Sequence, residues 1–134
     1  GRDSAETDTI KSFKHTNYVG QVSREETTKW QQKASIYISN SEVEPFGLAP
    51  VEALSQGCDI LISKNIGAIS IMSNIKDDDI IFNNLDENEI ASKILKLKQE
   101  GNNQRVFFGI DQEKSSTEYA SSRLLDIVTK LIQH

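Results

Sequence analysis

Two glutamates, Glu44 and Glu52, stand eight positions apart in the segment Glu-Pro-Phe-Gly-Leu-Ala-Pro-Val-Glu. The segment follows an apolar stretch typical of a buried strand and leads into a helix that we expect from about Pro50 to Gln56. A helix N-terminus offers free backbone N–H groups and a positive dipole end, which favour anions. Carboxylates are poor partners for phosphate, but they accept hydrogen bonds from the hydroxyls of a sugar and a ribose. The two features together indicate a nucleotide-sugar site.

Pro50 and Gly47 set the expected shape of this turn. Proline has no N–H and is tolerated in the first turn of a helix, so Pro50 fixes where the helix can begin. The amides that helical bonding leaves unused are those of Phe46, Gly47 and Leu48. Gly47 lets a ligand approach the backbone closely. Glu44 stays in the loop while Glu52 projects from the first turn, so the two carboxylates can face different parts of one extended ligand.

Strand-like and helix-like segments alternate along the chain, which predicts an α/β domain with a parallel sheet. Expected strands are 17–19, 36–39, 59–62 and 79–82, and expected helices are 23–33, 50–56, 67–73, one opening at Asp86 and one ending at about 132. Residues 101–114 read as a connector. Ligands of such sheets bind at the carboxyl ends of the strands. We expect further contacts on that rim from Ser41, Ser63 and Lys64.

Composition describes one folded domain. The chain has 134 residues, 37% of them hydrophobic and 26% charged, which suits a single core. Its net charge of −5 argues against a nucleic-acid partner. Cys58 is the only cysteine, which excludes an intrachain disulfide. The single cysteine, together with the lack of a signal peptide and of a membrane-length apolar run, indicates a cytoplasmic protein. Because the chain begins with Gly and without a strand signal, we expect residues 1–134 to be one N-terminally truncated domain of a larger protein.

The residues around the two glutamates resemble the retaining glycosyltransferases of the two-domain GT-B type, in the group that carries the Glu-x(7)-Glu motif. The matching residues are Glu44, Pro45, Phe46, Gly47, Leu48, Pro50, Glu52, Ala53 and Gly57. The likeness extends over roughly residues 15 to 132 and includes a closing C-terminal helix at about 116–132. It implies a Rossmann-like three-layer domain, the C-terminal half of the enzyme, which holds a nucleoside diphosphate sugar.

This resemblance implies a role for each site residue. Glu44 would be the catalytic residue and bind hydroxyls of the donor sugar, with the amides of residues 46–48 near the sugar and diphosphate. Glu52 would bind the ribose hydroxyls. No metal or other cofactor is expected, because the protein itself stabilises the departing diphosphate. The reaction would transfer a hexosyl group, with retention, to a glycan, lipid or other hydroxyl acceptor held by a missing N-terminal domain. Peripheral association of the enzyme with the cytoplasmic face of the membrane is compatible with that chemistry.

Two departures from the family pattern motivate a second hypothesis. Where the family has Gly-Gly-x-Pro-Glu, this chain has Ile66-Gly67-Ala68-Ile69-Ser70. The family's phosphate-neutralising Arg and Lys would lie upstream of the chain, so we expect it to be inactive in isolation. The alternative is a degenerate, non-catalytic module kept for binding or assembly. A nucleotide-sugar epimerase of the same fold is disfavoured by the Glu-Pro-Phe-Gly-Leu series. The base, sugar, acceptor and oligomeric state stay open.

Overall fold

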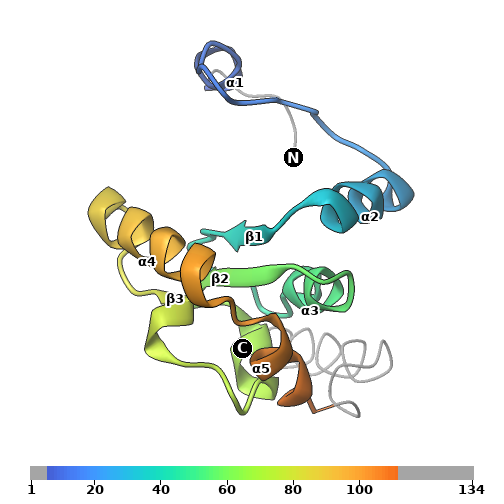
Figure 1. The fold of residues 1–134 in the computed structure, drawn as a ribbon. Coiled ribbons are helices and arrows are strands. Elements are labelled where there is room, and N and C mark those ends of the chain that lie inside the picture. Colours follow the sequence, from blue (N-terminus) through green and yellow to red (C-terminus); the bar gives the residue numbers. More distant parts are fainter. Residues whose placement is uncertain (1–5, 112–134) are drawn as a thin grey trace, which may run out of the picture.

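The computed structural model describes residues 6–111, whose strands form one parallel sheet in the order β1-β2-β3 (Figure 1). The strands are β1 (Ile36–Ser39), β2 (Asp59–Ser63) and β3 (Ile80–Ile81). In the register, Ile36 lies opposite Asp59, and Ser63 lies opposite Ile81. The parallel pairing and three of the four predicted strands are therefore confirmed.

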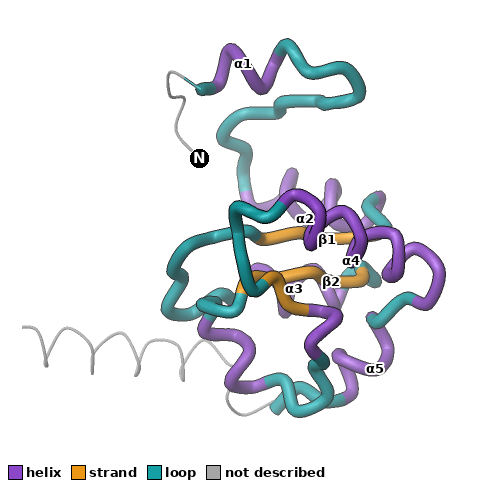
Figure 2. Tube along the Cα trace, turned by 90° about the vertical axis from the view of Figure 1, so that its left-hand side faces the viewer, coloured by secondary structure: helices purple, strands orange, loops and turns teal. Residues whose placement is uncertain are grey.

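The described residues also form five α-helices and two short 3-10 helices. They are α1 (Thr7–Lys11), α2 (Arg24–Lys33), α3 (Leu48–Ser55), η1 (Gly67–Ile71), η2 (Asp77–Asp79), α4 (Glu87–Glu100) and α5 (Asn103–Phe108). The start of α2 is the predicted capping box, in which Ser23 Oγ accepts from the Glu26 N–H and the Glu26 carboxylate accepts from the Ser23 N–H. Helix α1 lies apart from the sheet in both views (Figures 1 and 2).

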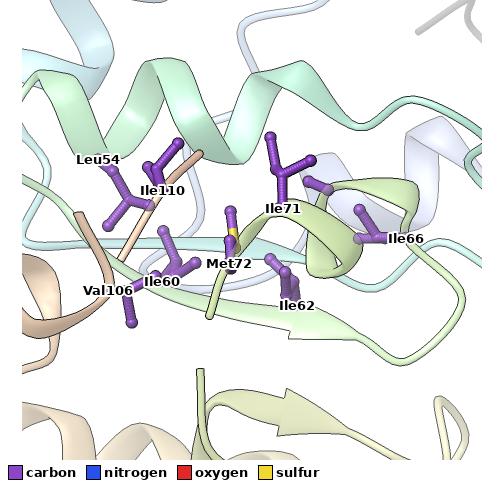
Figure 3. Packing of buried hydrophobic residues seen from close by; sticks show 9 residues of the cluster. Leu54, Ile60, Ile62, Ile66, Ile71, Met72, Val106 and Ile110 are labelled. Carbon is purple, nitrogen blue, oxygen red and sulfur yellow. The ribbon is translucent and has the colours of Figure 1, made fainter. Parts of the chain in front are cut away.

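The core has one hydrophobic cluster on each face of the sheet. On one face, α3, η1 and α5 pack against β2 through Leu54, Ile60, Ile62, Ile66, Ala68, Ile71, Met72, Val106 and Ile110 (Figure 3). On the other face, Leu97 of α4 packs on Leu61 and Ile81. Strand β2 is consequently buried on both sides, as its continuous apolar run predicts. The arrangement is a Rossmann-like three-layer α/β domain.

One predicted strand is wrong and another is too long. Residues 17–19 have no strand structure, because no described strand lies beside them to complete their backbone hydrogen bonds. The strand predicted over 79–82 shortens to β3, since Asp79 ends η2 and turns its carboxylate into a buried hydrogen-bond network.

One connector prediction and two helix predictions also differ from the structure or fall outside it. The stretch 101–114 is no simple connector, because it contains α5, whose first N–H groups (those of Asn102 and Asn103) donate to Asp59 Oδ1 at 2.7 and 2.8 Å. Helix α3 begins at Leu48, two residues before the expected start at Pro50. The closing helix predicted at about 116–132 lies outside the described residues.

Candidate functional site

The loops that follow the three strands meet at the carboxyl edge of the sheet, as the topology requires. Asn40 Nδ2 donates to the Asn84 carbonyl at 2.8 Å, which joins the loop after β1 to the loop after β3. Asn65 Nδ2 donates to the Glu42 carbonyl at 2.9 Å and joins the loops after β1 and β2. The predicted rim is therefore one connected surface made by all three strands.

The backbone of Glu44 is held by the loop after β2. Glu44 forms a parallel bridge with Ile66, its N–H donates to the Asn65 carbonyl at 3.3 Å, and its own carbonyl accepts from the Gly67 N–H at 2.7 Å. Within residues 6–111, no hydrogen bond or ion pair engages the half-buried Glu44 side chain. The loop thus fixes where Glu44 sits and leaves its carboxylate available to a ligand.

Gly47 forms the turn from this loop into α3. It adopts the left-handed conformation, with φ 59° and ψ 42°, at the N-cap of the helix. A Cβ at this position would lie 2.4 Å from Ile66 Cγ2, so both conformation and space require glycine. No backbone partner among the described residues accepts from the N–H groups of Phe46, Gly47 or Leu48. These donors lie in the first turn of α3 or just before it, where the helix dipole favours a negative group.

Glu52 lies in the second turn of α3, because the helix starts earlier than the sequence predicts. Its Oε1 accepts from Arg24 Nη2, at the start of α2, at 2.8 Å. The pair is open to solvent, with 86% of the Arg24 side chain and 41% of the Glu52 side chain exposed. Arg24 therefore stands beside the expected ribose contact, and sequence reasoning missed it because nothing local links the two helices.

Tyr37 is a second residue that the sequence did not single out. It is half-buried in β1 against the cluster that includes α3. Burial raises the pKa of Tyr37 above its ordinary value, and the negative charges of Glu44 and Glu52 raise the pKa further, although a hydrogen bond from Ser39 lowers it. The two glutamates are therefore close enough to Tyr37 to oppose its ionisation.

The three remaining rim residues differ in what they offer a ligand. Ser63 is buried, and its hydroxyl hydrogen is donated to the Ser41 carbonyl, so this side chain ties two loops together. The half-buried Ser41 hydroxyl lies 3.4 Å from that of Ser39. Lys64 is exposed, and its backbone N–H pairs with the Ile81 carbonyl. Lys64 therefore offers a solvent-exposed positive charge in the loop after β2, at the same edge of the sheet as the free loop amides.

The altered loop after β2 shapes the site through its one glycine. A Cβ on Gly67 would lie 1.8 Å from the Pro45 carbonyl oxygen, so the two backbones touch directly. Ser70, where the family pattern has glutamate, donates its hydroxyl to the Gly67 carbonyl at 2.9 Å. The loop keeps its contact with the Glu44 segment while carrying no carboxylate at that position.

A pocket of about 150 Å³ lies at the opposite, amino edge of the sheet. Its charged lining residues are Lys76, Lys96, Arg105, Asp78, Asp79 and Glu100. Asp78 pairs with Lys96 and Asp79 with Arg105, so the charges balance within the protein. This pocket lies away from both candidate carboxylates and offers no net charge to a ligand.

In the part of the chain that the structure describes, no group of three or more His, Cys, Asp or Glu side chains is arranged to hold a metal ion. Metal-independent chemistry stays a prediction. None of the described helices is both long and apolar enough to cross a membrane.

Helix α4 holds the third loop of the rim through Glu89. Its carboxylate accepts from the N–H groups of Phe82 and Asn83, at 2.7 and 3.0 Å, and from Lys93 Nζ at 2.9 Å. The Phe82 N–H, Lys93 and the Asn83 N–H lower the pKa of Glu89 from its ordinary value of 4.5 to about 2. The loop after β3 is therefore tied to α4 by an ionised side chain at neutral pH.

The Glu89 contacts predict an acid dependence of stability. Because the folded pKa is depressed, the unfolded chain takes up the proton first, so this stabilisation is complete above about pH 4.5 and is lost as pH falls through about 2. Carboxyl-detected NMR should give Glu89 a midpoint near pH 2. Glu89→Gln should raise the pH midpoint of acid unfolding. The control is Glu87→Gln, which removes an exposed carboxylate of the same first turn and should leave that midpoint nearly unchanged. A Glu89 midpoint at its ordinary value would contradict the contacts.

Parallel α/β sheets of this kind bind their ligands at the carboxyl edge, where the two candidate carboxylates and the free helix-start amides of this chain lie. The sequence profile of the glycosyl transferases group 1 matches residues 7–115, and the chain belongs to that family. It is 36% identical over 67 residues to sucrose-phosphate synthase of Zea mays and 34% identical over 62 residues to sucrose-phosphate synthase of Spinacia oleracea. These segments cover 50% and 46% of this chain and 6% of each relative. No solved structure matches significantly.

Proposed function

We propose that this chain forms the donor-binding part of a hexosyltransferase and binds a nucleoside diphosphate sugar at the carboxyl edge of its sheet. The observation that carries the proposal is the order of groups at the turn into α3: the Glu44 carboxylate and the amides of residues 46–48 have no partner among the described residues, and Glu52 follows in the second turn of the helix. One elongated ligand with hydroxyls at both ends and negative charge in the middle suits that order of groups.

Each part of the donor has a proposed contact. Glu44 is the proposed catalytic residue and accepts hydrogen bonds from the donor-sugar hydroxyls, since its carboxylate has no protein partner. The amides of Phe46, Gly47 and Leu48 face the sugar and diphosphate, where the dipole of α3 adds a favourable field. Glu52 accepts from the ribose hydroxyls. Fixed donors of this kind stabilise charge that develops on a leaving diphosphate without a metal ion.

The remaining parts of the proposal rest on family membership. The whole protein would transfer the sugar with retention to a glycan, lipid or other hydroxyl acceptor bound by a second domain, in the cytoplasm or at its membrane face. The relatives are named for sucrose-phosphate synthesis, which supports sugar transfer as the general chemistry. The matched segment is too small a part of them to carry their substrates over to this chain.

A non-catalytic module is the second candidate, and the loop after β2 favours it. Ser70 donates its hydroxyl to Gly67 and brings no carboxylate to the donor. Under this reading the edge would still bind a nucleotide sugar but would not turn it over. Sugar release by the complete polypeptide, lost in Glu44→Gln, would exclude the second candidate.

Ligand-detected NMR titrations of the chain test the binding proposal. The probes are UDP-glucose, ADP-glucose and GDP-mannose, each compared with its free nucleoside diphosphate. Glu52→Gln should weaken the binding of both the nucleotide sugar and its free nucleoside diphosphate about tenfold, because a charge-assisted hydrogen bond to the ribose is lost. Glu44→Gln should weaken only the nucleotide sugar by a similar factor, because its contact is to the sugar.

Glu100→Gln is the matched control, since Glu100 ends α4 at the opposite edge of the sheet. It should bind every probe as the unchanged protein does. If none of the probes binds the unchanged protein, donor binding by this chain is wrong. If Glu52→Gln binds as tightly as the unchanged protein, the ribose assignment is wrong.

A further inference from the structure

Helices α2 and α3 both begin at the carboxyl edge of the sheet and touch through polar side chains. At their starts, Arg24 Nη2 donates to Glu52 Oε1 at 2.8 Å. Further along, Gln32 Nε2 donates to Gln56 Oε1 at 3.0 Å. The first turn of α2 therefore borders the same surface as the carboxylate proposed to hold the ribose, although 28 residues separate Arg24 from Glu52 in sequence.

The geometry of this pair leaves binding capacity on both partners. A guanidinium has five N–H donors and a carboxylate has about four acceptor positions, and one hydrogen bond joins Arg24 to Glu52. Glu52 Oε2 has no partner among the described residues. A ligand hydroxyl can therefore donate to Glu52 while Arg24 stays in place.

Stability is a poor explanation for the pair. Both side chains are substantially exposed, and exposed ion pairs contribute little to folding. What the contact does restrict is the rotamer of Glu52, which a ligand would otherwise have to immobilise at a cost in affinity. We propose that Arg24 is a positioning residue of the ribose site, which holds the Glu52 carboxylate with Oε2 turned toward the ribose hydroxyls. This inference rests on the proposed function and extends the ribose site from α3 to α2.

A comparison of ribonucleotides with deoxyribonucleotides isolates this role. The probes are UDP, ADP and GDP with their 2′-deoxy counterparts, titrated by ligand-detected NMR. Arg24→Gln should weaken the bound ribonucleotide about three- to tenfold, the cost of one immobilised side chain. It should change the deoxy counterpart much less, because that ligand already lacks one hydroxyl contact to Glu52. The ratio of the two affinities should fall accordingly.

Two further variants separate positioning from charge and from folding. Arg24→Lys keeps a cation that can reach Glu52. Its ratio of ribonucleotide to deoxyribonucleotide affinity should therefore lie between those of Arg24→Gln and the unchanged protein. Lys29→Gln removes the exposed ion pair with Glu25 on the same helix and should leave both affinities unchanged. The thermal midpoint should be the same within error for all three variants, since each affects only an exposed pair.

Three results would overturn the inference while leaving the proposed function intact. Equal weakening of the ribo and deoxy ligands by Arg24→Gln would mean that Arg24 attracts phosphate. Tighter binding would mean that Arg24 blocks Glu52, and unchanged binding would mean that the pair has no role. If the unchanged protein itself makes no distinction between the ribo and deoxy ligands, and Glu52→Gln binds both equally well, the ribose assignment fails and the inference fails with it.

Discussion

Replacing Asp79 by alanine should lower the free energy of unfolding by about 3 kcal/mol, because it removes a buried carboxylate that accepts hydrogen bonds from Arg105 and Asn102. The Asp79 side chain is 1% exposed and accepts from Arg105 at 2.8 and 3.0 Å. Asn102 Nδ2 and the Lys76 N–H also donate to it, each at 2.8 Å. Urea unfolding at neutral pH, followed by circular dichroism, measures the difference.

The expected loss is large because Asp79 joins β3 to α5. Burial opposes ionisation of Asp79, but the hydrogen bonds from Arg105, Asn102 and the Lys76 N–H outweigh it and hold its pKa below the ordinary value. Asn102 in turn bonds both the N–H and the carbonyl of Ile60 in β2. Removing one carboxylate thus takes the shared acceptor from the buried Asn102 amide, the partly buried Arg105 guanidinium and the Lys76 N–H.

Asp78→Ala is the matched control for this prediction. Asp78 is the neighbouring residue, and its carboxylate pairs with Lys96 at the surface. Its removal should change the unfolding free energy little, since exposed pairs contribute little. A loss in Asp79→Ala no larger than that in Asp78→Ala would mean that the buried network does not stabilise the fold.

Replacing Gly67 by alanine should cost about 3 kcal/mol of stability and also damage the candidate site. The added Cβ would lie 1.8 Å from the Pro45 carbonyl oxygen and 2.6 Å from its carbonyl carbon. Backbone atoms cannot rotate away, so the loop that carries Glu44 must shift, and overpacking of this kind falls at the upper end of the usual range. Since Glu44 also pairs with this loop through its own backbone, we expect nucleotide-sugar affinity to fall at least tenfold if the proposed function is correct.

Gly57→Ala separates the steric effect from the cost of losing a glycine. Gly57 ends α3 with φ 97°, and a Cβ there meets nothing within 4 Å. Its replacement should cost about 1 kcal/mol from backbone strain alone and leave nucleotide-sugar binding intact. If Gly67→Ala unfolds and binds like Gly57→Ala, the contact between the two loops has no influence on the site.

Local chemistry was sufficient to predict the elements whose signals lie within a few residues. The Ser23 and Glu26 capping box marks the start of α2, and the side chain of Asp86 caps α4. The apolar run of β2 predicted a strand buried on both faces. These elements are stabilised by contacts between near neighbours or by a simple apolar pattern, so the sequence contains the information in readable form.

Helix α5 was not predicted because its stabilising contacts come from distant residues. Its N-terminal N–H groups are accepted by Asp59, at the start of β2, and its Arg105 is bound by Asp79. Six residues of moderate helix propensity would be marginal alone. The predicted strand over 17–19 failed for the opposite reason, because a strand needs a neighbour and the described residues provide none.

The candidate site likewise has features that the local sequence predicts and features that depend on tertiary packing. The order of Glu44, the glycine turn and Glu52 along the chain was enough to indicate the family and to propose which carboxylate meets which part of a donor. The approach of Arg24 to Glu52, the bridge between Glu44 and Ile66 and the contact of Gly67 with Pro45 appear only in the folded chain. Each joins residues from different loops or helices, whose distances depend on how the layers pack against the sheet rather than on any local spacing.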